Sequence, residues 1–231
     1  MARTARHRAL ISWSSGKDSA WALQVVRERG DLEPVGLLTT CDEASGRVSM
    51  QGVRRELVEA QSAATGLPVW WVALPWPCPN EEYERRMAGV VEEALAHDID
   101  RMVFGDLFLE DVRAYRVGKL RGSGAEPVFP IWCGRGGTLE VARRMISSGL
   151  RAVVTSVDPS QLDSSFAGRE FGSDFLAELP PDVDPLGERG EFHTFCYAGP
   201  MFDDPIRFGR GGVSEVGAFT RADLISTAGS E

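Results

Sequence analysis

The residues with the clearest chemical potential lie close together at residues 12–19, which read SWSSGKDS. Backbone N–H groups at the start of a helix lack partners within the helix, and the helix dipole favours an anion there. Small side chains let phosphate oxygens approach these groups, and a glycine adopts backbone angles that other residues avoid. The segment therefore predicts a phosphate-binding turn between a strand and a helix. The residues expected to contact a nucleotide are Ser12, Ser14, Ser15, Gly16, Lys17, Asp18 and Ser19, with Thr39 added from the end of the next expected strand.

Lys17 and Asp18 narrow the chemistry of this turn. The segment lacks the glycine spacing of a Walker loop, and Asp18 stands where that loop has serine or threonine. Lys17 supplies a positive charge for phosphate oxygens, in a chain whose only other lysine is Lys119. A carboxylate beside a polyphosphate is repelled unless Mg²⁺ lies between them. We therefore expect the magnesium-bound pyrophosphate group of ATP at the turn, with Lys17 and Asp18 as catalytic residues and Asp18 as the metal ligand.

A second group of polar residues follows the fourth expected strand. Gly105 would let a nucleotide approach the backbone, and Asp106 could hold its ribose or a water bound to magnesium. Glu110 and Arg113 begin the next expected helix, beside the same edge of the sheet. This position favours contacts of Glu110 and Arg113 with a substrate.

A third group lies at residues 188–194, where a loop flanked by glycines leads into an expected strand. Alternation along the strand places Glu191 and His193 on one face. An acid beside an imidazole can orient the ring or raise its pKa, and such a pair could deprotonate ammonium or hold a substrate carboxylate. We therefore expect Glu188, Glu191 and His193 to be catalytic and Thr194 to contact the substrate.

Alternating strands and helices must position these groups in the first part of the chain. Apolar runs predict strands at residues 8–12, 35–40, 68–74, 102–105 and 127–132. Helical periodicity, with glycines as stops, predicts helices at residues 18–29, 53–65, 80–97 and 110–121. Strands separated by helices of this length form parallel sheets with right-handed crossovers, and their ligands bind beyond the carboxyl ends of the strands.

The chain changes character after a glycine-rich link at residues 134–137. We expect a helix at 138–148, a strand at 150–157, short helical pieces up to 179, a loop at 180–190 and antiparallel strands within 192–197 and 206–220. The predicted fold class is therefore α/β. It combines a Rossmann-like, parallel-sheet ATP-binding domain over residues 1–133 with a smaller, substrate-binding α+β domain over residues 134–231.

Composition narrows the setting of this chemistry. A net charge of −9 argues against a broad nucleic-acid surface, and no apolar run approaches the ~20 residues that cross a bilayer. The four cysteines lack the CxxC spacing of a zinc site, so a reduced, cytoplasmic protein without membrane contact is expected. Among the tryptophans, Trp132 is the one expected to line the cleft, because it ends the fifth expected strand.

Residues 12–19 are similar to the SGGKDS loop of the N-type ATP pyrophosphatases of the PP-loop superfamily, with Ser15 where a second glycine is usual. Three further segments resemble one branch of that group, the diphthine–ammonia ligase family: SMQGVR at residues 49–54, GDLFLEDVR at residues 105–113 and GERGEFHTF at residues 187–195. The resemblance covers roughly residues 8–202. Gln51 departs from it, because the family usually has histidine at this place.

The resemblance implies an adenine-nucleotide-hydrolase-like fold and an ATP-dependent, amide-forming ligase. Such an enzyme adenylates a carboxylate, releases pyrophosphate and uses ammonia to displace AMP, and it needs ATP, Mg²⁺ and ammonium. In the family the acid is diphthine, a modified histidine of translation elongation factor 2 in eukaryotes and archaea, whereas a bacterial chain would need another carboxylic acid. The residues then expected to bind the substrate are Gln51, Arg54, Glu110, Arg113, Trp132 and Thr194.

Two other functions stay open. A nucleotide-binding sensor without turnover would explain the fold and the phosphate turn, but not Asp18 or the group at residues 188–194. A PP-loop enzyme that modifies tRNA usually needs a sulfur-carrying or metal-binding set of cysteines and a basic RNA surface, and this sequence has neither. Self-association into a homo-oligomer is also left open.

Overall fold

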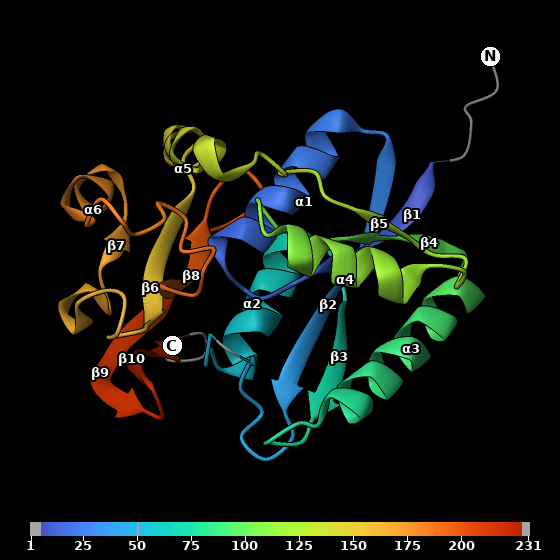
Figure 1. Ribbon diagram of the computed structural model, residues 1–231, viewed down its shortest axis with the longest axis horizontal. Helices are drawn as coiled ribbons and strands as arrows, with labels where there is room; N and C mark the ends of the chain where they lie inside the picture. Colours follow the sequence, from blue (N-terminus) through green and yellow to red (C-terminus); the bar gives the residue numbers. More distant parts are fainter. Residues whose placement is uncertain (1–5, 50, 228–231) are drawn as a thin grey trace.

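Five parallel strands form the first sheet of the computed structural model, which describes residues 6–49 and 51–227. The strands are β1 (His7–Ser12), β2 (Leu32–Asp42), β3 (Val69–Leu74), β4 (Ile99–Val103) and β5 (Glu126–Val128). Their order is β3–β2–β1–β4–β5 (Figure 1), and the order reverses beside β1, which pairs with both β2 and β4. Ligands of such sheets bind at this reversal, beyond the carboxyl ends of the strands. The turn after β1 therefore lies where a ligand is expected.

Four helices cover the two faces of this sheet: α1 (Lys17–Arg29), α2 (Arg55–Thr65), α3 (Asn80–Ala96) and α4 (Glu110–Leu120). Alternation along β1 places Ala9 and Ile11 in a core shared with α1 and α2, and Leu10 in a second core shared with α3. Left-handed glycines end α1 and α2, with φ of 65° at Gly30 and 68° at Gly66. Both helix stops follow the expectation from the sequence.

An antiparallel sheet forms the second part of the structure. Its elements are η1 (Arg135–Gly137), α5 (Thr138–Ser147), β6 (Arg151–Val157), η2 (Ser164–Phe166), β7 (Glu170–Phe171), α6 (Ser173–Glu178), β8 (Phe192–Ala198), β9 (Phe208–Val216) and β10 (Phe219–Ser226). Strand β6 pairs with β7, β8 and β10, and β10 pairs with β9. Figure 1 shows α1 and α2 between the two sheets, so β8 and β10 approach these helices.

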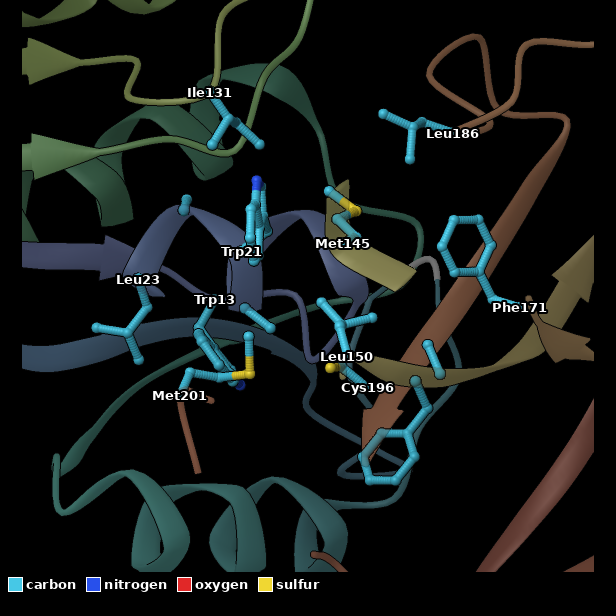
Figure 2. Close-up of a cluster of buried hydrophobic side chains, with 14 of the residues drawn as sticks. Trp13, Trp21, Leu23, Ile131, Met145, Leu150, Phe171, Leu186, Cys196 and Met201 are labelled. Atoms are coloured by element: carbon cyan, nitrogen blue, oxygen red, sulfur yellow. The ribbon is translucent and has the colours of Figure 1, made fainter. Parts of the chain in front are cut away.

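The two sheets share one hydrophobic core. A single cluster joins Trp13 and Trp21 of the first part to Leu150, Phe171 and Cys196 of the second (Figure 2). The strands of the first sheet end at residue 128, and those of the second begin at residue 151. The boundary expected at residues 133/134 thus lies between the two sheets in the sequence, but the hydrophobic core is continuous across it. That residues 133/134 separate two domains stays a prediction.

The expected α/β fold class is confirmed, and the differences concern strand ends. β5 ends at Val128, because Pro130 has no N–H with which to continue the pairing, and Trp132 therefore lies in an irregular segment beyond the sheet. β2 begins earlier than expected and includes Pro34, at a point where its register with β1 shifts. Met50, within the segment 49–54 that carries part of the resemblance, lies outside the described residues.

Among the described residues, none of the helices has the length and apolar character needed to cross a membrane.

Candidate nucleotide-binding site

The turn between β1 and α1 has a constrained backbone. Ser15 has φ of 67°, in the left-handed region that favours glycine, and Gly16 adopts φ of −85° and ψ of 173° directly before α1. The Ser15 carbonyl accepts hydrogen bonds from the Cys196 N–H at 2.9 Å and from Gln61 Nε2 at 3.0 Å. These two bonds hold Ser15 in a conformation that is unfavourable for serine. The positive φ accounts for the glycine that the resembling loops usually have here.

Strand β8 closes one side of the turn. Thr194 Oγ1 accepts a hydrogen bond from the Lys17 N–H at 3.1 Å. A Cβ atom at Gly16 would lie 3.1 Å from the Thr194 carbonyl oxygen, so a larger residue at this position would push the strand away. Thr194, which the sequence predicts to contact the substrate, is instead engaged with the backbone of the turn.

Lys17 differs from the expectation of an ammonium group that faces phosphate. Its side chain is 2 % exposed, and Nζ donates to the Leu186 carbonyl at 2.5 Å and to Asp18 Oδ2 at 3.0 Å. The rings of Phe192 and Phe171 lie 5.1 Å and 5.6 Å from Nζ. Lys17 therefore links α1 to the loop before β8. Direct contact with a phosphate group would require that loop to move, and this contact stays a prediction.

Asp18 is the charged residue that the turn presents, with a side chain 27 % exposed. Its Oδ2 pairs with Lys17, whereas Oδ1 is buried and has no hydrogen-bond partner among the described residues. Burial raises the pKa of Asp18, Lys17 opposes this rise, and the nearby charge of Asp184 adds to it. A carboxylate oxygen without a partner fits Mg²⁺, which takes one or two protein carboxylates together with phosphate oxygens. Within residues 6–49 and 51–227, no three acidic, His or Cys side chains form a metal site by themselves.

The hydroxyl groups of the turn divide into exposed and buried ones. Ser14 is half-buried, and its Oγ lies 3.3 Å from Ser19 Oγ, which donates to the backbone of the turn at 3.0 Å. Ser15 Oγ and Thr39 Oγ1 are buried, and the described part of the chain offers them no hydrogen-bond partner. Ser12 is half-buried at the end of β1. Ser14 is thus the hydroxyl best placed to meet a ligand.

Gly105 and Asp106 follow β4 and meet protein groups. A Cβ atom at Gly105 would lie 3.0 Å from the carbonyl carbon and oxygen of Asp18, so this glycine lets the first turn of α1 approach β4. The carboxylate of Asp106 forms a bidentate pair with Arg116, at 2.5 Å to Nε and 3.1 Å to Nη2. A direct role of Gly105 and Asp106 in nucleotide binding stays a prediction.

Glu188 brings the loop before β8 to the end of β4. Its Oε1 accepts a hydrogen bond from the Leu107 N–H at 2.8 Å. Burial raises the pKa of Glu188 to about 7, and the charges of Asp18 and Asp106 contribute to the rise, while the Leu107 hydrogen bond and Lys17 oppose it. Lys17, Asp18 and Glu188, all singled out from the sequence, therefore lie in one electrostatic cluster.

Glu191 holds the loop before β8 together. It is 1 % exposed and accepts hydrogen bonds from the backbone N–H groups of Asp184 and Arg189, each at 2.9 Å. The Arg189 guanidinium also pairs with it at 2.8 Å. These partners make Glu191 a positioning residue of the loop.

His193 does not have the raised pKa that the sequence suggests. Burial lowers the pKa of His193 to about 4, the charges of Lys17 and Arg221 lower it further, and Glu191 offsets only part of the effect. Its Nε2 is buried without a hydrogen-bond partner in the described ranges. Of the two expected effects of Glu191, the raised pKa of His193 is wrong, because desolvation and two cations outweigh one carboxylate, and a catalytic role of His193 stays a prediction.

Two of the expected substrate residues, Gln51 and Arg54, lie near a cavity beyond the ends of β2 and β3. Gln51 lines this cavity, which has a volume of about 1010 Å³ and lies beyond the ends of β2 and β3. Arg54 pairs at 2.6 Å with Asp223, another residue of the cavity wall.

Three other expected substrate residues, Trp132, Arg113 and Glu110, form no hydrogen bond or ion pair with residues 14–19 within the described ranges. Trp132 lines a smaller cavity of about 190 Å³ between α1 and α5, and the Arg113 guanidinium lies 4.7 Å from its ring. Glu110 is exposed at the start of α4. Neither this cavity nor the larger one is lined by residues 14–19, and a role of Trp132, Arg113 and Glu110 in substrate binding stays a prediction.

Gln61 is a residue of the site that sequence reasoning missed. It is completely buried in α2, where Nε2 donates to Ser15 O at 3.0 Å and Cys196 O at 2.6 Å, and Oε1 accepts from Trp13 Nε1 at 2.8 Å. Its position four residues after Leu57 places it on the buried face of the helix, and a buried amide requires partners. That spacing was the available signal.

Two family models match the chain. The model described as the diphthamide synthase N-terminal domain matches residues 7–122, and the one described as the diphthamide synthase C-terminal domain matches residues 137–212. The first match includes the turn with Asp18, the second includes Glu188, and residues 213–231 lie beyond both. A search of curated proteins finds no match. The resemblance in the motifs is thereby confirmed, and the chain belongs to the diphthamide synthase family, a family of PP-loop, ATP-using enzymes.

Proposed function

We propose that this protein is an ATP-dependent ligase that joins ammonia to a substrate carboxylate and converts ATP to AMP and pyrophosphate. The observation that carries the proposal is Asp18. Its carboxylate lies at the start of α1, in the turn where the sheet order reverses, and one buried oxygen has no hydrogen-bond partner in the part of the chain that the structure describes. Such an oxygen suits a magnesium ion shared with a polyphosphate. Membership of the diphthamide synthase family supports the same reaction class.

The turn supplies the phosphate-binding groups of this proposal. The start of α1 carries the positive end of the helix dipole, and the half-buried Ser14 hydroxyl lies beside it. Mg²⁺, when bound at Asp18, would neutralise charge on the departing pyrophosphate. Lys17 adds a buried positive charge 3.0 Å from Asp18 Oδ2, which favours the ionised form of that carboxylate.

Adenylation solves a chemical problem of amide formation. A free carboxylate is a poor electrophile and has no good leaving group. An oxygen of the acid attacks the α-phosphorus, the bond to the β-phosphate oxygen breaks, and pyrophosphate departs. Ammonia then forms a C–N bond, AMP leaves, and the nitrogen loses a proton. The protein contributes mainly by positioning the reactants and stabilising the charge that develops.

Glu188 is the residue we assign to the proton transfer. Its carboxyl has a pKa raised to about 7, so it is partly ionised near neutral pH and can accept a proton from ammonium. It also lies in the same electrostatic cluster as Asp18. His193, whose pKa is lowered to about 4, stays neutral and suits hydrogen bonding better than proton storage.

The acid is diphthine on translation elongation factor 2 if the chain serves an archaeon or eukaryote, and another carboxylic acid if it serves a bacterium. A cytoplasmic location accords with the need for ATP and with the four free cysteines, Cys41, Cys78, Cys133 and Cys196.

Product analysis tests the proposal. The protein is incubated with ATP, Mg²⁺, ammonium and a panel of carboxylic acids, and phosphorus NMR follows the products. AMP with pyrophosphate, dependent on the acid, supports the ligase. ADP with phosphate would indicate a kinase or simple ATPase, and ATP binding without turnover would indicate a nucleotide-binding sensor.

A further inference from the structure

The cavity of about 1010 Å³ lies between the first sheet and the β9–β10 hairpin. Its walls come from the ends of β2 and β3, from the turn that includes Ser49 and Gln51, and from residues 212–223 of the hairpin. This volume is at the upper end of the range typical for small-molecule sites. The nucleotide turn does not contribute to it, so the cavity is available for a second ligand.

Arg221 is an arginine of the cavity wall that forms no ion pair with the described residues. Its Nε is buried without a hydrogen-bond partner, and no carboxylate among the described residues forms an ion pair with it. Asp223, the nearby acid, is shared between Arg47 at 3.0 Å and Arg54 at 2.6 Å. A guanidinium in this state is suited to a planar oxyanion, because it can donate two parallel hydrogen bonds to a carboxylate.

The wall also carries Arg47 and Asp223, which pair with each other, Asp42, which binds Ser45, and several large apolar side chains. Trp76 is 83 % exposed, and Val213 and Val216 of β9 are 57 % and 42 % exposed, although all three are large apolar residues. Leu74 and Phe219 line the cavity as well. Arg221, the wall arginine outside the ion pairs of the described residues, together with these apolar side chains favours a ligand with a negative group on an apolar body.

His193 connects this cavity to the nucleotide turn. Ser156 of β6 pairs with His193 on β8 and with Arg221 on β10, so the three residues form a row across the second sheet. The His193 ring lies 6.3 Å from the ring of Phe219, in the cavity wall. The charges of both Lys17 and Arg221 act on His193. A ligand on Arg221 would therefore lie in the same cross-strand row as His193, on which Lys17 of the turn acts.

We propose that this cavity binds the acid substrate, a monocarboxylate with an apolar aliphatic or aromatic body, and that Arg221 holds its carboxylate. The description of this ligand as a substrate rests on the proposed function, but its binding does not. Most of the hairpin wall, from Val213 onward, lies beyond the family matches, which end at residue 212. The hairpin would then determine which acid this particular chain accepts.

Fluorescence of Trp76 reports binding at this place. Trp76 lines the cavity and is largely exposed, whereas Trp13 and Trp21 are buried. The protein is titrated without ATP, using phenylacetate and hexanoate as probes, and phenylacetamide and hexanamide as their neutral counterparts. We expect a saturable change for at least one carboxylate, a change that disappears in Trp76→Phe, and a weaker response to the amides.

Arg221→Gln should weaken carboxylate binding by about tenfold or more and leave amide binding unchanged. Arg221→Lys, which keeps the charge but loses the planar fork, should give an intermediate effect and serves if the first variant is unstable. Arg207→Gln is the matched control, because Arg207 is exposed and does not line the cavity. The carboxylate affinity of Arg207→Gln should equal that of the unmodified protein.

Equal carboxylate affinity in the unmodified protein and both Arg221 variants would overturn the assignment, as would the absence of any Trp76 response to the probes. Separate assays of AMP and pyrophosphate distinguish this failure from failure of the proposed function. Carboxylate binding without AMP formation would retain the site and refute the ligase. AMP formation with an unchanged KM for the acid in Arg221→Gln would retain the ligase and refute the site.

Discussion

Asp18 is the residue on which the proposed chemistry depends most. Its Oδ1 has no hydrogen-bond partner among the described residues and lies at the start of α1, which supports the proposed magnesium role, while Lys17 holds the other oxygen. The pKa of Asp18 is raised mainly by burial, so a bound cation would favour the charged form that the protein alone disfavours.

Asp18→Asn should lower the rate of AMP and pyrophosphate formation by about 10²-fold or more, because an uncharged amide oxygen holds magnesium much less tightly than a carboxylate. Phosphorus NMR of the products measures the rate. Asp31→Asn, at an exposed position outside the site, is the control and should retain full activity. A near-normal rate in Asp18→Asn would remove Asp18 from the reaction.

Glu188 makes stability depend on pH. Its pKa is about 7 in the folded protein against an ordinary value of 4.5, so the folded state keeps a proton that the unfolded chain releases. The stability contributed by this proton is complete below 4.5 and is lost as pH rises through about 7. In Glu188→Gln this dependence should flatten, and amide formation should lose its rise with pH in the same window.

Urea unfolding at several pH values across that window measures the effect. Glu92→Gln, exposed on α3, provides the comparison and should keep the pH dependence of the unmodified protein. An unchanged profile in Glu188→Gln would show that Glu188 titrates in its ordinary range.

At the scale of elements, β8 and α2 hold the nucleotide turn in shape. Gln61 of α2 contacts Trp13, Ser15 and Cys196, and it thereby joins the residue directly after β1, the turn and β8. Thr194 of β8 accepts the Lys17 N–H. The turn is therefore supported by elements that lie far from it in the sequence.

Gln61→Leu should reduce the free energy of unfolding by about 3 kcal/mol, because it leaves several buried polar groups without partners. Chemical denaturation measures the change. Gln161→Leu, at an exposed position, should change stability by less than about 0.5 kcal/mol. A small loss in Gln61→Leu would mean that water replaces the amide.

Ser15→Gly should raise stability by about 1 kcal/mol, since glycine adopts φ of 67° without strain. Activity should be retained, because the Ser15 carbonyl keeps both of its donors. Ser14→Gly is the matched control. Ser14 is not among the residues with positive φ, so glycine there should lower stability through added chain entropy. Equal effects at the two positions would argue against strain at Ser15.

At the scale of the whole molecule, the common core makes the two sheets interdependent. Because Trp13 and Phe171 belong to one buried cluster, loss of either sheet would expose the other. We expect a single unfolding transition in urea that coincides by tryptophan fluorescence and by far-ultraviolet circular dichroism. Two separate transitions would support independent domains on either side of residue 133.

Local patterns predict the fold well but only part of the site. Apolar periodicity and glycine stops identified the elements from β1 to α4, because parallel sheets and their helices repeat a regular pattern. The burial of Lys17 depends on Leu186, and the support of Ser15 depends on Cys196, so neither follows from residues 12–19 alone. Trp132 was expected to end the fifth strand but lies beyond it, because Pro130 ends the strand early.

The turn at residues 14–19 as a magnesium–nucleotide site is the central claim, and calorimetry tests it most directly. The protein is titrated with the α,β-methylene analogue of ATP, which cannot be cleaved at that bond, in the presence and absence of Mg²⁺. We expect saturable, one-to-one binding that requires Mg²⁺ and is lost in Asp18→Asn. No heat of binding with Mg²⁺, or equal binding by the Asp18→Asn variant, would contradict the account.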